Sequence, residues 1–273
     1  MFKTRRSSRK MVPEVLRFQS EVFGRPVQHF EELLERDPWF EPKNTLVLLS
    51  RGRLVGSLQL FPKPVRIGGA SVRMGGVGNV ATHPGYRGRG HATRLLEETI
   101  QLMRDGGYGF SVLFTRISDF YRRLKWEIAS PRHKYVISAL RACGESSGNF
   151  RVDPLRVNDL PAVMKMYEAA NERRTLSVLR SRECWRRQLD HRLDETARSI
   201  VIKKGKHVLA YGRYKMTKRR IWVIEAGCSP GPDSRTALQE LLAFIGKQAL
   251  SEGRSHISVY VPPDNPLVRE VLA

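Results

Sequence analysis

Residues 77–92 read VGNVATHPGYRGRGHA, an apolar strand that runs into a glycine- and arginine-rich turn and then directly into a helix. Gly88 and Gly90 lack a Cβ, so the backbone at these positions can take unusual angles and approach a ligand closely. The following helix leaves its first amide groups unpaired and has the positive end of its dipole there. The stretch therefore predicts a phosphate-binding site, to which Arg87 and Arg89 add cationic groups.

The spacing of this turn excludes two common phosphate-binding motifs. It lacks the Gly-Lys-Ser/Thr of a P-loop and the Gly-x-Gly-x-x-Gly of a dinucleotide site. It matches Arg/Gln-x-x-Gly-x-Gly/Ala, with Arg87, Gly90 and Ala92 at the defined positions. This pattern resembles the acyl-CoA loop of the GNAT (GCN5-related N-acetyltransferase) superfamily, in which the loop amides hold the coenzyme pyrophosphate and the preceding strand pairs with the pantetheine arm. The resemblance implies acetyl-CoA as co-substrate and the following cofactor-binding residues: Ala81, Thr82, His83, Arg87, Gly88, Arg89, Gly90, His91 and Ala92.

The size and apolar content of the chain suit a protein of two ordinary domains. It has 273 residues, of which 41% are hydrophobic, enough for two cores. No stretch approaches the roughly 18 to 20 apolar residues of a membrane span. The basic start, residues 1–10, is not followed by the apolar stretch of a secretory signal. We therefore expect a cytoplasmic protein without a membrane partner.

The formal net charge of +21 allows three interpretations. The charge could attract an anionic cofactor, bind nucleic acid or an anionic surface, or be solvated surface. Because the arginines are dispersed along the chain, solvated surface is favoured, and nucleic acid is an open but less favoured partner. The three cysteines, Cys143, Cys184 and Cys228, are far apart and odd in number, so we expect free thiols and no metal site.

Hydrophobic spacing in the first half predicts helices and strands in the GNAT order. The family usually opens with a strand before the first helix, and only residues 1–10 could supply it here; we expect that strand to be missing or poorly formed. The predicted helices are 12–23, 29–36, 92–103 and 119–124, and the predicted strands are 45–49, 54–67, 71–81, 110–114 and 133–140.

The same order restarts after a polar, glycine-rich segment, which indicates a tandem repeat of one fold. The fold class is α/β (α+β): tandem GNAT folds, each with a mixed, mostly antiparallel twisted sheet flanked by helices. We expect a catalytic domain at 1–142, a linker at 143–149 and a degenerate domain at 150–273 that lacks the last two strands. Its predicted helices are 159–173, 181–193 and 233–250, and its predicted strands are 150–155, 198–202, 207–216, 220–226 and 256–261.

The second repeat lacks the phosphate-binding turn. The equivalent segment, residues 228–233, contains two prolines, which remove amide donors, and Asp233, which repels phosphate. We expect this repeat not to bind coenzyme.

Acetyl transfer needs a polarised thioester, a neutral amine and a proton for the departing thiolate. A backbone amide near Ala81 and Thr82 is the expected polariser. Tyr121 is the expected general acid, because residues 120–126 resemble the Phe-Tyr-x-x-x-Gly-Phe segment of the family, in which the tyrosine hydroxyl lies near the sulfur. A tyrosine of the core with a satisfied hydroxyl is the alternative. Lys125 replaces the usual glycine, and Trp126 replaces the phenylalanine.

The general base is not defined by the sequence. Many relatives carry a glutamate on the fourth strand, but that position falls near Gly76 here. His83, next to the thioester strand, titrates near neutrality and is the tentative base. Glu41, Glu127 and a chain of waters remain open alternatives.

An active GNAT repeat followed by a degenerate one resembles the Eis-type acetyltransferases, which act on aminoglycosides and other polyamines. Those proteins add a sterol-carrier-like domain whose C-terminal carboxylate is the base, and we expect no such domain in this chain. The sequence predicts an acetyl-CoA-dependent N-acetyltransferase that acts directly on a primary amine of a small molecule or peptide. The absence of cysteine from residues 1–142 argues against a thiol intermediate. The alternative is a non-catalytic acyl-CoA sensor or a basic nucleic-acid-binding module, and a homo-oligomer is compatible with either.

Overall fold

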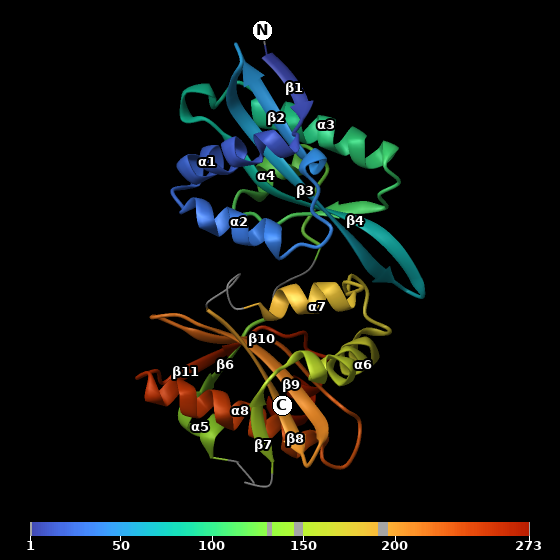
Figure 1. Ribbon diagram of the computed structural model, residues 1–273, viewed down its shortest axis with the longest axis vertical. Coiled ribbons are helices and arrows are strands. Elements are labelled where there is room, and N and C mark those ends of the chain that lie inside the picture. Colours follow the sequence, from blue (N-terminus) through green and yellow to red (C-terminus); the bar gives the residue numbers. More distant parts are fainter. Residues whose placement is uncertain (1, 130–132, 145–149, 191–195, 273) are drawn as a thin grey trace. The chain divides into compact units, whose positions relative to one another are not determined.

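The computed structural model describes residues 2–129, 133–144, 150–190 and 196–272, which form two compact units (Figure 1). The first unit comprises Met1–Ala129 and Arg174–Arg187, and the second comprises Ser130–Arg173 and Gln188–Ala273. Each unit has its own sheet and its own hydrophobic core.

The first unit is built on a mixed sheet in the order β1-β2-β3-β4-β5. β1 to β4 are antiparallel neighbours, and β5 runs parallel to β4, so the predicted mixed, mostly antiparallel sheet is confirmed. The strands are β1 (Phe2–Arg6), β2 (Thr45–Ser50), β3 (Arg53–Ile67), β4 (Ala70–Thr82) and β5 (Phe110–Val112). The helices are α1 (Val12–Phe23), α2 (Val27–Glu35), α3 (His91–Asp105) and α4 (Ser118–Arg122).

Alternating side chains give this sheet two covered faces. Leu46 and Leu48 of β2 belong to the core that contains Leu95 of α3. Val47, between them, packs instead against Val15 of α1. α3 therefore covers one face of the sheet and α1 the other, and β4, which leads into α3, lies between them.

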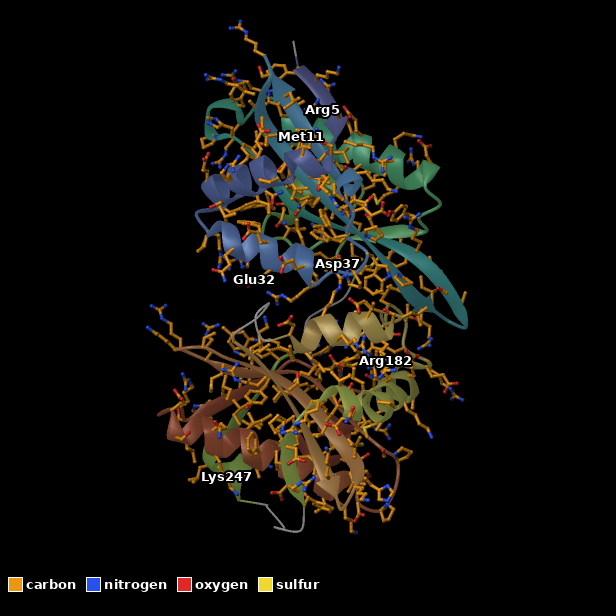
Figure 2. All side chains as sticks on the ribbon, in the orientation of Figure 1. Arg5, Met11, Glu32, Asp37, Arg182 and Lys247 are labelled. Atoms are coloured by element: carbon orange, nitrogen blue, oxygen red, sulfur yellow. The ribbon has the colours of Figure 1, made fainter. Side chains whose placement is uncertain are left out.

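The expectation that the opening strand is missing was wrong. β1 pairs antiparallel with β2 over all five of its residues, and Arg5 donates to Met11 Sδ at 3.0 Å, as Figure 2 allows the reader to follow. The burial of β1 alternates, with Phe2 and Thr4 partly buried and the basic residues exposed. Basic side chains on the solvent side of an edge strand are common. In residues 2–6 they outnumber the apolar side chains, so the alternation of burial could not be predicted from the composition of this segment.

The second unit repeats this strand order and adds one strand. Its sheet has the order β6-β11-β10-β9-β8-β7, in which β7 to β10 are antiparallel neighbours and β11 is parallel to β10. The strands are β6 (Tyr135–Ser138), β7 (Arg151–Pro154), β8 (Ala197–Lys204), β9 (His207–Met216), β10 (Ile221–Cys228) and β11 (His256–Val259). The helices are α5 (Ala139–Cys143), α6 (Leu160–Asn171) and α8 (Ser234–Ser251).

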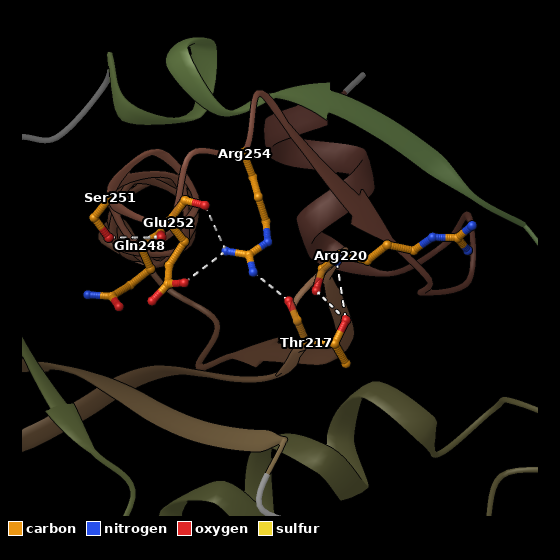
Figure 3. Close-up of polar contacts among 6 residues, drawn as sticks. All are labelled: Thr217, Arg220, Gln248, Ser251, Glu252 and Arg254. Atoms are coloured by element: carbon orange, nitrogen blue, oxygen red, sulfur yellow. Dashed lines mark hydrogen bonds and ion pairs between the residues drawn. The ribbon is translucent and has the colours of Figure 1, made fainter.

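A partly buried arginine, Arg254, connects the end of α8 to the β9–β10 turn (Figure 3). Arg254 donates to the backbone carbonyl and the carboxylate of Glu252, and to the carbonyl of Thr217. A cation at this position satisfies carbonyl groups that a helix end leaves free. The contact fixes the turn against the helix that forms the centre of the second core.

Two segments belong to a different unit from the one that the sequence predicted. The strand predicted at 133–140 to end the first domain is β6, which pairs with β11, and its last residues turn into α5 because Ser138 caps that helix. β6 therefore lies where the second repeat was expected to lack a strand. Residues 174–187 belong to the first unit: the amides of Leu176 and Leu179 each donate to carbonyls at the end of β3, at 2.8 Å. Residues 145–149 of the predicted linker lie outside the described residues.

Within the described ranges, no helix combines the length and the apolar character that crossing a membrane requires.

The close approach of α3 to β4 depends on Gly75. A Cβ at this position would clash with Met103 Sδ and lie 2.9 Å from Leu60 Cδ1. We expect Gly75→Ala to lower the free energy of unfolding by about 2 kcal/mol, the usual cost of overpacking a core, as measured by urea denaturation. Gly69→Ala is the matched control, because nothing lies within 4 Å of its Cβ position. Equal stabilities of the two variants would contradict this account of the packing.

Candidate active site

The turn between β4 and α3 presents free backbone amides. Gly88 and Gly90 both have left-handed conformations, with φ of 73° and 75°, and a Cβ on either would meet open space. In the part of the chain that the structure describes, the amides of Gly88, Arg89 and Gly90 have no backbone hydrogen-bond partner. Gly90 is the N-cap of α3, and the first turn of that helix contains no acidic residue. The local backbone is therefore arranged to receive an anion.

The side chains around this turn divide into those facing solvent and those held in the core. Arg87 donates from Nε to the carbonyl of Thr82 at 3.2 Å, and the Arg89 guanidinium lies 5.9 Å from the ring centre of Tyr86. Because the side chains of Ala81 and His91 are buried, only their backbone can face a ligand. The other two predicted cofactor-binding residues next to them, Thr82 and Ala92, are half-buried.

His91 has a structural position that the sequence did not indicate. Its ring lies 4.3 Å from that of Phe2 and 6.3 Å from that of Tyr86, centre to centre. The first strand thus packs directly beneath the start of α3. This contact joins the edge of the sheet to the turn that carries the free amides.

β4 and β5 separate at the level of this turn. They pair at only three positions, Met74 to Gly76 with Phe110 to Val112. Beyond Gly76, β4 continues to Thr82 with β3 on one side and no described strand on the other. The edge of β4 nearest the turn is therefore open, and a strand edge with unpaired backbone groups readily accepts an extended ligand.

A β-bulge in the pairing with β3 distorts β4 along the stretch whose other side is open. The register places Ser57 opposite Ala81 and Gln59 opposite Gly78, so Asn79 and Val80 share one partner residue. Asn79 has φ of 49°, and its Nδ2 donates to Oε1 of Gln59, which is only 1% exposed. The bulge lies directly before Ala81 and Thr82, where the sequence predicted the backbone amide that polarises the thioester. Asparagine tolerates the left-handed region better than most residues, so the asparagine at position 79 was the feature of the sequence that could have indicated the bulge.

Tyr121 lies in α4, the helix that follows β5. Its ring packs edge-on against Phe120 at 5.0 Å and Trp126 at 6.2 Å, and burial raises its pKa. Trp126 donates from Nε1 to Ser111 Oγ of β5 at 2.7 Å. The tyrosine is therefore held on the β5 side of the opening and stays protonated at neutral pH.

The expected bases have structural partners. His83 is exposed, and its Nδ1 accepts from the amide of Gly85 at 3.1 Å, which caps the short helix at Pro84–Tyr86. The neutral ring therefore carries its proton on Nε2, and its only basic lone pair is on Nδ1, where it already accepts the amide of Gly85. Glu41 forms an ion pair with Lys43, and Glu127 forms one with Arg122, so neither carboxylate is free. The described residues contain no group of three or more His, Cys, Asp or Glu that could hold a metal ion.

The equivalent edge in the second unit is occupied. β10 has a register irregularity between Val223 and Glu225, which repeats the bulge of β4. The carbonyl of Ala226 accepts from Nδ2 of buried Asn265 at 2.9 Å, and Asp233 at the start of α8 pairs with Lys204 at 2.9 Å. In this repeat, therefore, a side chain occupies a carbonyl of the strand, and an ion pair lies at the start of the helix.

Residues 3–129 match the family model described as "Acetyltransferase (GNAT) domain". These residues make up nearly all of the long segment of the first unit. The first unit is therefore a GNAT acetyltransferase domain, which belongs to the transferase class.

Individual relatives agree with this assignment. An uncharacterized N-acetyltransferase of Streptomyces avermitilis is 26% identical over 111 residues, which are 40% of this chain and 27% of that protein. A GCN5-related N-acetyltransferase of Kribbella flavida has a similar fold, with a TM-score of 0.79 at 19% identity over 99% of this chain and 66% of its own. Eis1 of Mycobacterium abscessus has a TM-score of 0.66 at 19% identity over 98% and 67%. The chain thus spans about a quarter of the curated relative and two thirds of the solved ones.

Lys125 occupies a backbone conformation that suits glycine. Its φ is 68°, which explains why the Phe-Tyr-x-x-x-Gly-Phe segment that residues 120–126 resemble usually has glycine at this position. We expect Lys125→Gly to raise the free energy of unfolding by about 0.5–1 kcal/mol, because relief of left-handed strain exceeds the added entropy of the unfolded chain. The check is thermal and urea denaturation. Arg123→Gly is the control, since Arg123 has φ of −58° and should lose stability; a loss at both positions would refute the strain.

Proposed function

We propose that the first unit is an acetyl-CoA-dependent N-acetyltransferase that moves the acetyl group directly to a primary amine of a small molecule or peptide. The observation that carries the proposal is the open edge of β4 beside the free amides of Gly88, Arg89 and Gly90. A family domain over residues 3–129 supports the class of reaction.

The open edge and the turn match two parts of the donor. The three amides and the positive end of α3 would hold its pyrophosphate, and the glycines leave space for it. The edge of β4 beyond Gly76 would pair with the pantetheine arm as it would with a neighbouring strand. This arrangement would deliver the thioester to the bulge at Asn79 and Val80, where the backbone departs from the sheet.

Direct transfer requires one bond to form and one to break. The lone pair of the neutral amine attacks the thioester carbon, so a C–N bond forms as the C–S bond breaks. The departing thiolate takes the proton of the Tyr121 hydroxyl, and the surplus proton on the amine passes to water or to Nδ1 of His83, which would then give up its bond from the Gly85 amide. Tyr121 then regains a proton from solvent.

The cysteines are consistent with this direct route. Residues 1–142 contain no cysteine, but Cys184 lies in the segment 174–187 and so belongs to the first unit. Its residue is only 2% exposed, so it cannot reach a thioester bound at the strand edge. In the second unit, burial raises the pKa of Cys228 to about 11, with a contribution from Glu270. A buried protonated thiol is a poor nucleophile.

The role of Tyr121 is tested by release of free coenzyme thiol in the presence of an amine panel. We expect Tyr121→Phe to lower kcat about 100-fold, within the usual range for loss of a general acid, with no change in the calorimetric Kd for coenzyme A. Burial raises the pKa of this phenol, so the wild-type rate should not fall through loss of the acid until the pH exceeds about 10. Thiol release that needs no amine, or a full rate in Tyr121→Phe, would refute the assigned reaction or role.

The bulge suggests how the amine is oriented. Gln59 accepts a hydrogen bond from Nδ2 of Asn79. The Oδ1 of Asn79 is therefore the atom that can accept a hydrogen bond from the N–H of the amine substrate. We expect Asn79→Gly, which suits the positive φ, to lower kcat/KM for the amine about tenfold, the value of one hydrogen bond. Gln59→Met, which keeps the length of the side chain, should cause a smaller loss. An equal loss of affinity for coenzyme A in the Asn79 variant would mean that the side chain supports the donor instead.

A further inference from the structure

A hollow of the first unit lies near the C-terminal end of α3, whereas the glycine turn lies at its N-terminal end. It encloses about 600 Å³, which is within the range of small-molecule sites. It is formed by the later turns of α3, the start of β5 and the turn that follows α4. Its lining residues are Glu97, Ile100, Met103, Arg104, Tyr108, Gly109, Phe110, Ser111, Arg123, Leu124, Lys125 and Trp126.

The walls of this hollow are aromatic and held in place. The Trp126 indole is anchored to Ser111 by its 2.7 Å hydrogen bond. The guanidinium of Arg73 lies 4.2 Å from the ring centre of Tyr108. Both rings and Phe110 are partly buried, so they offer flat apolar surface that is already fixed before any ligand binds. Such walls suit an aromatic or apolar body.

Three exposed cations lie around the same hollow. Arg104, Arg123 and Lys125 are exposed, and none forms an ion pair with another described residue. Glu97 is the one acid among the lining residues and is also unpaired in the described chain, so the lining has more positive than negative charge. The adjacent Arg122 differs, because it pairs with both Asp119 and Glu127.

The conformation of Lys125 makes its presence here informative. A lysine at φ of 68° carries left-handed backbone strain that glycine would avoid. Strained residues of this kind concentrate at functional sites. The strained residue adds a third cation to the two unpaired arginines that line this hollow.

This hollow is distinct from the glycine turn. None of residues 81–92 lines it, and the helical rise from His91 to Arg104 is about 20 Å. It is nevertheless connected to the chemistry, since Trp126 packs 6.2 Å from Tyr121.

We propose that this hollow binds an organic carboxylate with an aromatic body, its ring between Tyr108 and Trp126 and its charge toward Arg104, Arg123 and Lys125. The ligand would be a second small molecule beside the acyl donor and would contact the turn that supports Tyr121. The proposal does not depend on the transfer reaction.

The test is calorimetric titration of the full chain with 2-naphthoate and, separately, with neutral 2-naphthamide. We expect naphthoate to bind and the amide to bind at least fivefold more weakly. Lys125→Gly and Arg123→Gln should each weaken naphthoate about threefold to fivefold, the effect of one solvent-exposed charge. Arg122→Gln is the matched control and should stay within twofold of the wild type, since this side chain does not line the hollow.

Two further results would overturn the proposal. Saturating coenzyme A should leave the Kd for naphthoate unchanged, so displacement would show that the donor itself occupies the hollow. The absence of naphthoate binding to the wild type, or equal losses in the Arg122 and Arg123 variants, would reject an anion site here. Titration of coenzyme A into the same samples reports on the glycine turn separately, so failure of one site is distinguishable from failure of the other.

Discussion

The first unit depends on one strand that is paired on both sides along only part of its length. β4 has β3 beside it throughout but β5 for only three positions. A buried sheet normally pairs its backbone groups, because leaving them unpaired is costly. The part of β4 beyond Gly76 has no described strand on its second side, and four of its residues, 78–80 and 82, are only half-buried, so solvent or a ligand can satisfy it. The open edge is therefore a stable feature of the fold.

The elements around this edge hold it rigidly. Leu95 and Leu96 of α3 are fully buried, and Gly75 brings α3 against β4 without a clash. Arg87 satisfies the carbonyl of Thr82 at the end of the strand. Catalytic groups must be held within a few tenths of an ångström of their productive positions. A strand edge fixed from behind by a packed helix meets this demand better than a loop does.

The sequence predicted most elements because their periodicity and turn signals agree. Residues 12–23 and 207–216 form a helix and a strand with the predicted bounds, and the glycine turn was located from Gly88 and Gly90. What could not be predicted depends on long-range pairing. Residues 135–138 have a strand pattern, but no local property specifies that their partner is residues 256–259. The pairing of Asn79 with Gln59 likewise depends on strand register, which a single strand does not reveal.

The two units show how small a change separates an open edge from a closed one. Both have three antiparallel pairs followed by a parallel one, and both have an irregular register in the strand before the long helix. In the second unit, Asn265 donates to the Ala226 carbonyl of β10, and Asp233 places a carboxylate, paired with Lys204, at the start of α8. Asn265 occupies a backbone carbonyl that an extended ligand at the strand edge would need, and the carboxylate of Asp233 disfavours a phosphate at the helix start. The shared topology is thus neutral with respect to function, and the side chains at one strand edge and one helix start determine which unit can take an acyl donor.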